Sequence, residues 1–352
     1  MMPEEWPIAA SAGDHDGLAR RAGGDRLSTV RADFFLDPAE RLTEQERALM
    51  TAMLHCLVSD IADEVRAALP NMVVAANDEG NLALINQLSS AALLDRGGLV
   101  RLLLRRADEE RIATGARSRT GKREARLIQG LVSHQDGAVA AAAMVLIIAR
   151  GRRRDRFGQC LLHFDDLHRD DANALICAIA AAVRPELTTT KGGTDSDGLL
   201  TAAIAQVAAR HDSNSSIEQL TATLIRLLDE NGELDDKLIS AAAAEGEMNF
   251  LANALARRSG VSGDVALHEL LSADPKRIMV LLRLAGLKRE TAAGLLAGIG
   301  DLLGIRDPGR AIADFDRLSE ADCANASNWL SADPLYQQAV AALGTGNGQR
   351  TV

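Results

Sequence analysis

The sequence predicts an all-α protein, with HEAT- or armadillo-like stacked helical pairs followed by a second helical domain. Hydrophobic residues make up 47% of the 352 positions but aromatic residues only 3%. Such a chain, rich in Ala and Leu, favours helices because strands draw on β-branched and aromatic residues. Apolar residues also recur at helical spacing, and no alternating stretch is long enough to predict a strand.

The first predicted unit covers residues 42–69. Its apolar residues form a stripe with a 3.6-residue period in a first helix, a short break is expected at Ser59–Asp60, and a second stripe follows. Thr43 and Glu46 match a capping box, which gives the first helix a defined start. Neither helix can bury its stripe alone, so the pair predicts neighbours of the same kind.

A weak internal repeat supports stacking. The motif Leu57-Val58-Ser59 returns as Leu131-Val132-Ser133, an offset of 74 residues. That offset would hold about two units of the HEAT or armadillo kind, in which neighbouring helical pairs bury each other's stripes. A chance match of short apolar motifs in so Ala- and Leu-rich a chain is the alternative.

Composition divides the chain. The segment PELTTTKGGTDSDG, from Pro185 to Gly198, is rich in Thr, Gly and Asp and has the composition of a linker. We therefore predict these parts: a flexible arm at 1–32, a HEAT-like domain at 33–185, a linker at 186–198, a second helical domain at 199–343 and a flexible tail at 344–352.

Helix boundaries in the second half are marked by capping residues. Helices are predicted at 199–210, 217–230, 235–245 and 247–259. Glycines at helix ends indicate C-caps: Gly232, Gly246, Gly260 and Gly286. Later helix starts are indicated by Asp274-Pro275, Asp307-Pro308 and Ser319 with Asp322.

Cysteine usage and hydropathy predict a cytoplasmic protein. The four cysteines are far apart and form no CxxC pair, which is typical of buried thiols in a reducing compartment. The N-terminus lacks a basic region followed by an apolar one, so no signal peptide is predicted. The longest apolar run, 138–149, is shorter than the roughly 18 residues that cross a bilayer. We interpret it as a buried core helix, with no membrane partner.

Two parts of the chain resemble the bacterial domain of unknown function 2336. The first is the unit from Leu57 to Leu69, which reads LV.D....VR.AL. The second runs through these residues: Glu233 to Leu238, Gly246, Phe250, Ala254 to Ala256, Gly260 and Arg283 to Leu287. The sequence departs at Ile112 to Arg117, where the family usually carries AIA.R. The resemblance spans about residues 42–300 and implies a helical, HEAT-like bacterial protein without an assigned activity.

Residues suited to chemistry do not form a convincing catalytic or metal site. Cys160, His163 and His168 lie in an Asp-rich segment and could contribute to a zinc site. A solvated helix junction explains that segment better, because the ligand set is mixed and lacks a second half-site. Lys191-Gly192-Gly193-Thr194 is not in the Walker order. We predict no enzyme activity, cofactor or metal.

The strongest anomaly is charge. Fourteen basic and six acidic residues between Arg101 and Arg156 give this segment +8, whereas the whole chain carries −10. In a stack of helices these side chains could form one basic ridge. We predict that it binds a partner through these residues: Arg105, Arg106, Arg117, Arg119, Lys122, Arg123, Arg152, Arg153, Arg154 and Arg156. The alternative is that the ridge is solvated or pairs with the protein's own acidic half.

Two functions follow from these observations. The first is a non-catalytic scaffold or regulator that binds another protein with an acidic surface. The second is a nucleic-acid-binding helical repeat that uses the basic ridge between Arg101 and Arg156. Overall acidity and the lack of aromatic residues among the arginines favour the first, because single strands are bound by stacking on aromatic side chains.

Overall fold

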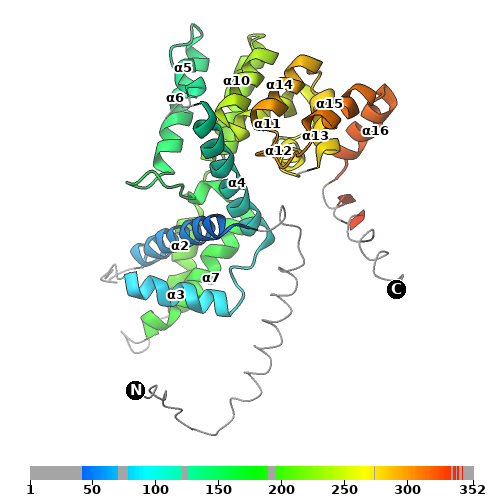
Figure 1. Cartoon of the computed structure of the whole chain (residues 1–352). Helices are drawn as coiled ribbons and strands as arrows, with labels where there is room; N and C mark the ends of the chain where they lie inside the picture. Colours follow the sequence, from blue (N-terminus) through cyan, green and yellow to red (C-terminus); the bar gives the residue numbers. More distant parts are fainter. Residues whose placement is uncertain are drawn as a thin grey trace, which may run out of the picture. The chain divides into compact units, whose positions relative to one another are not determined.

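The computed structural model describes the following residues: 42–69, 78–120, 126–188, 196–272, 274–333, 336–337, 339–340 and 343. Regular structure in these segments is helical (Figure 1), apart from an isolated bridge between Arg154 and Cys160. The all-α prediction is therefore confirmed. None of the described helices is both long enough and apolar enough to cross a membrane. The predicted arm at 1–32 and tail at 344–352 lie outside the described residues.

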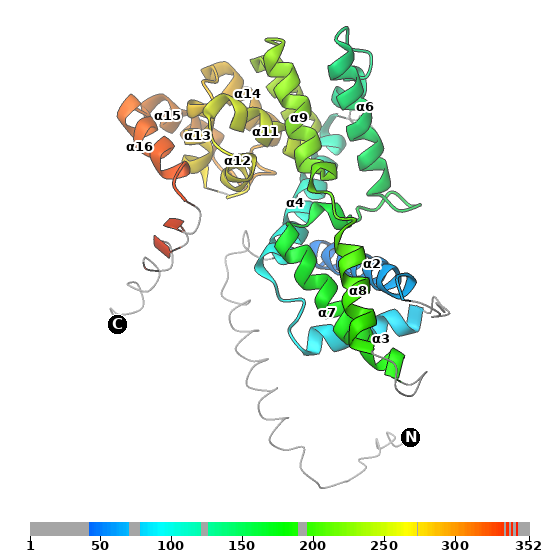
Figure 2. The same ribbon diagram turned by 180° about the vertical axis from the view of Figure 1, so that it is seen from behind.

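One group of helices encloses a first apolar cluster. Its members are α2 (Glu44–Ala67), α3 (Asp78–Ser90), the first half of α4 (Gly97–Thr120), α7 (Arg169–Thr188) and α8 (Ser196–Ala208). Helix α2 lies at the centre and packs against the four others, as Figures 1 and 2 show. Met53, Leu57 and Ile61 on α2 are at most 2% exposed, so its stripe forms the core of this group.

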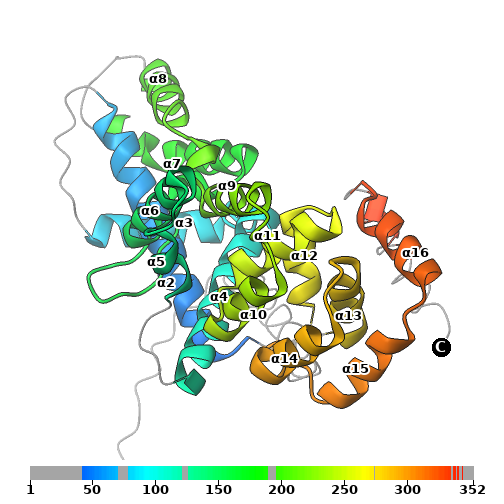
Figure 3. The ribbon, with the colours of Figure 1, turned by 90° about the horizontal axis from the view of Figure 1, so that it is seen from above.

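A second group encloses a larger apolar cluster. Its members are α5 (Leu127–Leu131), α6 (Gly137–Arg152), α9 (Ile217–Glu230), α10 (Asp236–Glu245), α11 (Met248–Ser259), α12 (Gly263–Leu270), α13 (Pro275–Leu284), α14 (Arg289–Ile299) and α15 (Pro308–Arg317). Helix α16 (Glu320–Leu330) packs against α13. Figure 3 shows this group from above. Phe250 and Phe315 are at most 1% exposed and fill its core.

Helix α4 belongs to both groups. Its first half contributes Leu99 and Leu103 to the first cluster, and Ile112 in its second half belongs to the second. Along its length it contacts α2 and then α10, α11 and α14. A single long helix thus connects the two cores.

The two apolar cores do not follow the predicted division at 186–198. Helix α6 precedes that segment but packs with α9 in the second cluster, whereas α8 follows it but packs with α7 in the first. Residues 189–195 of the predicted linker lie outside the described residues. The chain crosses between the cores more often than composition indicated.

The predicted break at Ser59–Asp60 is wrong. Helix α2 continues from Glu44 to Ala67, and buried residues lie on both sides of the position, Leu57 before it and Ile61 after it. Asp60 is exposed, so its polar side chain is compatible with an unbroken helix. Helix α4 likewise continues without a break from Gly97 to Thr120, through the charged residues Asp108, Glu109 and Glu110.

Capping signals located helix ends well. Helix α9 has the predicted bounds, Asp274 and Asp307 are N-caps, and Ser319 forms a capping box with Asp322. All four predicted C-cap glycines have φ between 66° and 77°, a region that disfavours side chains: Gly232, Gly246, Gly260 and Gly286. In the second half of the chain, N-cap residues and C-terminal glycines therefore mark where the helices begin and end.

Candidate functional site

Most of the predicted ridge arginines pair with the protein's own acids. Lys122 and Arg123 lie outside the described residues. Six of the other eight form ion pairs with carboxylates: Arg105, Arg106, Arg117, Arg119, Arg153 and Arg154. For Arg152 and Arg156 the described part of the chain offers no carboxylate partner.

Arg153 is held by a buried carboxylate. It caps the C-terminus of α6, is 7% exposed, and donates to both oxygens of Asp166 at 2.8–3.0 Å. It also donates to the backbone oxygens of Ala149 and Ser215. Asp166 ends the 3₁₀ helix η1 (Phe164–Asp166), and the capping box with His163 fixes its position. A bidentate pair of this kind is both strong and geometrically specific.

Arg106 extends the same network from α4. Its guanidinium lies 2.7 Å from Glu109, 2.7 Å from Glu218 on α9 and 3.9 Å from Asp166. We call Arg106, Glu109, Arg153, Asp166 and Glu218 the ionic join, because their elements belong to both apolar groups. The prediction that Arg106 and Arg153 bind a partner is wrong, since 4% and 7% exposure leave no surface to contact.

The arginines of the ionic join favour the charged forms of Asp166 and Glu109. Burial raises the pKa of Asp166, but the guanidiniums of Arg106 and Arg153 outweigh it and hold that pKa below its usual value. Burial likewise raises the pKa of Glu109, and Arg106 and Arg105 outweigh it to give a lowered pKa. Mutual pairing therefore offsets the loss of hydration that each buried charge suffers.

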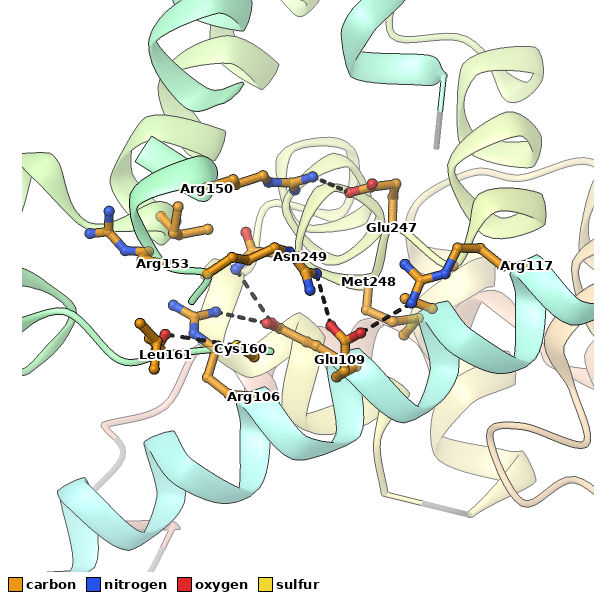
Figure 4. A pocket seen from close by; sticks show the side chains of 15 residues that line it. Arg106, Glu109, Arg117, Arg150, Arg153, Cys160, Leu161, Glu247, Met248 and Asn249 are labelled. Carbon is orange, nitrogen blue, oxygen red and sulfur yellow. Dashed lines mark hydrogen bonds and ion pairs between the residues drawn. The ribbon is translucent and has the colours of Figure 1, made fainter. Parts of the chain in front are cut away.

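A cavity of about 140 Å³ opens beside the ionic join (Figure 4). Its wall includes Arg106 and Glu109 from α4, Arg150 near the end of α6, and Met248 and Asn249 at the start of α11. Figure 4 shows these side chains converging from separate helices.

Ion pairs also line this cavity. Glu110 accepts from Arg117 at 3.0 Å and from Arg154 at 2.9 Å, and Glu247 accepts from Arg150 at 2.7 Å. These arginines are only partly buried, so the lining remains in contact with solvent.

The residues weighed for a metal site do not converge. Burial raises the pKa of Cys160 to about 11, so its thiol stays protonated at neutral pH and is a poor ligand or nucleophile. His163 accepts from the backbone of Asp165, and His168 is exposed. Within the described segments, no three residues of ligand type are grouped to hold a metal. The metal hypothesis gains no support from this arrangement.

Helix α6 has an exposed apolar face that the sequence interpretation missed. Val139, Ala143 and Leu146 pack inward. On the opposite face Met144, Val145 and Ile148 are 43–48% exposed, and Ala141 is exposed beside them. We call Ala141, Met144, Val145 and Ile148 the α6 stripe. The interpretation of 138–149 as a buried core helix therefore holds for one face of α6 and is wrong for the other.

A signal for the α6 stripe was present in the sequence. The run is apolar on all sides, and a helix of that kind needs a cover on each face. At its C-terminal end Arg152 is exposed, and Arg156 lies with its guanidinium carbon 4.7 Å from the centre of the Phe157 ring. Phe157 itself is 74% exposed.

These features define an all-helical protein whose described residues form two apolar cores, an internal ionic network and an exposed apolar face on α6. The family described as "Uncharacterised protein conserved in bacteria (DUF2336)" matches residues 87–324, and the chain belongs to that family. The resemblance noted in the sequence is thereby confirmed. The matched region includes both the ionic join and the α6 stripe. A search of curated proteins found no match. Neither did a search of solved structures.

Proposed function

We propose that this protein is a non-catalytic interaction scaffold that binds a partner protein on the α6 stripe. The observation that carries the proposal is the exposure of Met144, Val145 and Ile148 together on one helix face. Contiguous exposed apolar side chains with a polar rim are typical of interaction sites. A regulatory role and a cytoplasmic location belong to the same proposal, and the free thiols of the described cysteines agree with a reducing compartment.

The chemistry at the end of the stripe indicates the partner. Arg152 and Arg156 add positive charge, and Phe157 adds an exposed aromatic ring. An amphipathic helix with apolar residues along one face and acidic residues at one end would complement this surface. The partner is thus a protein with an acidic surface, which contacts two of the predicted arginines rather than the whole ridge.

The packing of the second group supports a HEAT-like stack as the platform for this surface. Helices α6, α9, α11, α13 and α15 each pack against the next. A second row is formed by α5, α10 and α14, with contacts to the first row through α6, α11 and α15. Two rows of helices that contact mainly their neighbours are the arrangement of helical-repeat proteins. Helix α6 would then be the end of the first row, where none of the other described helices covers its outer face.

Nucleic-acid binding through a basic ridge is less well supported. The ridge would need exposed arginines with free charge, and six of the eight described candidates pair with carboxylates. Phosphate contacts depend on cations that can release counterions into solution. Internal pairing removes most of that contribution.

Photo-crosslinking in the source cells tests the proposal. A photoreactive amino acid replaces Ile148 in the α6 stripe, and in a matched control it replaces Leu82 on α3, which is equally exposed at 50%. We expect a discrete protein adduct from position 148 and none of that size from position 82. The double change Arg152→Glu and Arg156→Glu should weaken the adduct, because the acidic partner is then repelled.

Several outcomes would overturn the proposal. These are no adduct at position 148, the same adduct at both positions, or an adduct unaffected by the charge reversal. An adduct of twice the mass of the chain would assign the surface to a second copy instead. An adduct that nuclease removes would favour nucleic acid.

A further inference from the structure

A second apolar helix face lies near the C-terminal end of the described chain. The described residues within 336–343 are helical, and four of them are exposed aromatic or aliphatic residues: Tyr336, Ala339, Val340 and Leu343. We call these four residues the C-terminal face. Their spacing is i, i+3, i+4 and i+7, which places them on one side of a helix. Tyr336 and Leu343 are 59% and 73% exposed, so solvent contacts this side.

The C-terminal face is attached to the end of α16. The ring of Tyr336 lies edge-on to that of Trp329, with 6.2 Å between the ring centroids. Nε2 of Gln337 donates to the backbone oxygen of Trp329 at 2.6 Å. The carboxylate of Asp333 accepts from the backbone N–H of Tyr336 at 3.4 Å, at the start of this helical stretch. Trp329 is itself 42% exposed and extends the apolar surface.

The α6 stripe has the same spacing as the C-terminal face. Its four residues also recur at i, i+3, i+4 and i+7, from Ala141 to Ile148. Two helices with apolar residues at this spacing bury each other's exposed side chains when they pack side by side. Each of the two faces is therefore a suitable cover for the other.

The two faces of one chain lie too far apart to meet. Successive contacts join α6 to α9, α9 to α11, α11 to α13 and α13 to α16. Packed helix axes are about 8–10 Å apart, so three intervening helices separate α6 from α16. Figures 1 and 2 show these two helices on opposite sides of the second group. A C-terminal face that covers the α6 stripe must therefore come from a second copy.

Charge indicates how the two faces would be oriented. Residues 318–349 contain no Lys or Arg but three acids: Glu320, Asp322 and Asp333. With the two helices antiparallel and Ile148 opposite Tyr336, exposed Arg152, one turn further along α6, lies opposite the turn that contains Asp333. This orientation brings opposite charges together and also opposes the two helix dipoles.

We propose that the α6 stripe of one copy packs antiparallel against the C-terminal face of a second copy, and that this contact covers the stripe when the partner protein is absent. The covering role rests on the proposed function, because only a partner that uses the same stripe competes with the second copy. The contact joins two different surfaces, so each copy keeps one face for a further copy. Faces of four residues are small, so the association is weak.

Sedimentation equilibrium of the purified full chain tests the contact, over about 10–500 µM because small interfaces form weak complexes. We expect an average mass that rises with concentration above that of the monomer. Val145→Glu in the α6 stripe and, separately, Val340→Glu in the C-terminal face should each be monomeric. Leu82→Glu is the matched control, because Leu82 is 50% exposed on α3, outside both faces. It should associate as the unchanged chain does.

An equimolar mixture of Val145→Glu and Val340→Glu identifies the two surfaces. Each variant keeps the face that the other has lost, so the mixture should form dimers that do not extend further. A mixture that stays monomeric would overturn the inference. So would a variant that still associates alone, because one of the faces would then pair with its own counterpart.

The melting temperature shows whether each variant is folded. Arg152→Glu remains informative if one of them is not, since it should weaken association several-fold without changing either apolar face. The crosslink from Ile148 in cells tests the partner separately. A purified chain that is monomeric throughout would overturn the second-copy contact and leave the partner's adduct unaffected. Self-association of the purified chain, with only an adduct of twice its mass in cells, would support this contact and overturn the proposed partner.

Discussion

Arg152 and Arg153 are neighbours in the chain but lie in opposite environments. Arg153 is 7% exposed and bound by Asp166, whereas Arg152 is exposed and lacks a carboxylate partner in the described structure. One residue of helix rotates a side chain by about 100°, which separates the inward from the outward face. A run of like charges in a sequence therefore does not define a surface.

Two regions of the molecule differ in the same property, the exposure of their side chains to solvent. The ionic join is a set of largely buried charges, and their pairing offsets the free-energy cost of removing them from water. The α6 stripe is a set of apolar side chains that solvent contacts. The ionic join links elements of the two apolar groups through ion pairs. We propose that the α6 stripe serves binding.

The largest decrease in the free energy of unfolding is expected from Asp166→Ala. This change leaves the buried guanidiniums of Arg153 and Arg106 without their shared carboxylate, and removing one partner of a buried ion pair destabilises by about 3–5 kcal/mol. Chemical denaturation followed by circular dichroism measures the difference. An effect below about 1 kcal/mol would mean that the ionic join does not connect the two cores as described.

A smaller loss of stability is expected from Gly246→Ala, at the point where the end of α10 approaches α4. Gly246 has φ of 69°, and an added Cβ would lie 2.8 Å from the Cα of Ala113. Left-handed strain of this kind amounts to about 1–3 kcal/mol, and the contact adds to it. Gly232→Ala is a good control, since it also has positive φ but meets no neighbour. Equal melting temperatures for the two variants would argue against the close approach.

Acid should weaken the protein through the ionic join. The folded-state pKa values of Asp166 and Glu109 are lowered, so their contribution is complete above the unfolded values of about 3.9 and 4.3. It is lost as pH falls through the folded pKa. The pKa values of Asp108 and Asp60 are raised, chiefly by the partial burial of their carboxyl groups and for Asp60 also by Asp63 and Glu64. The contribution of these two groups to stability therefore increases as pH falls. We expect the melting temperature to fall between pH 5 and pH 3, and to fall less steeply in Asp166→Asn. A rise on acidification would contradict this account.

The smallest effect is expected from Arg119→Ala. Arg119 pairs with Asp301 at the end of α4, but both side chains are more than a third exposed. Exposed pairs contribute about 0–1 kcal/mol because water competes for both charges. Thermal denaturation should detect little change. If Arg119→Ala lowered the melting temperature as much as Asp166→Ala does, burial would not be what distinguishes the ion pairs of Asp166 from the exposed pair of Arg119.

Local signals in the sequence predicted helices and their ends well. Gly246, Gly260 and the capping box at Ser319 needed only nearby residues, and the structure has them as expected. The break at Ser59–Asp60 failed because polar residues on the exposed face do not end a helix whose other face is buried.

The candidate site depended on contacts that the sequence does not display. Arg106 and Arg153 meet Asp166 and Glu218 across elements that are up to 112 positions apart, so their pairing could not be seen in the charge count. The alternative that the ridge pairs with the protein's own acidic half was open in the sequence. Four of the eight described candidates pair with acids outside residues 101–156: Arg105, Arg106, Arg119 and Arg153. Arg117 and Arg154 pair instead with Glu110, inside the basic segment. In α6 the sequence misled in the other direction, because apolar residues that were expected to be buried are exposed. An apolar run does not indicate which face of a helix its neighbours leave uncovered.

The most direct test compares Arg152→Glu with Arg153→Glu by urea denaturation of the full chain. The account predicts that Arg152→Glu changes the free energy of unfolding by no more than about 0.5 kcal/mol, as exposed substitutions do. Arg153→Glu should lower it by at least about 3 kcal/mol, because a second carboxylate is then buried against Asp166. Equal effects of the two reversals would contradict the distinction between buried and exposed arginines on which the account rests.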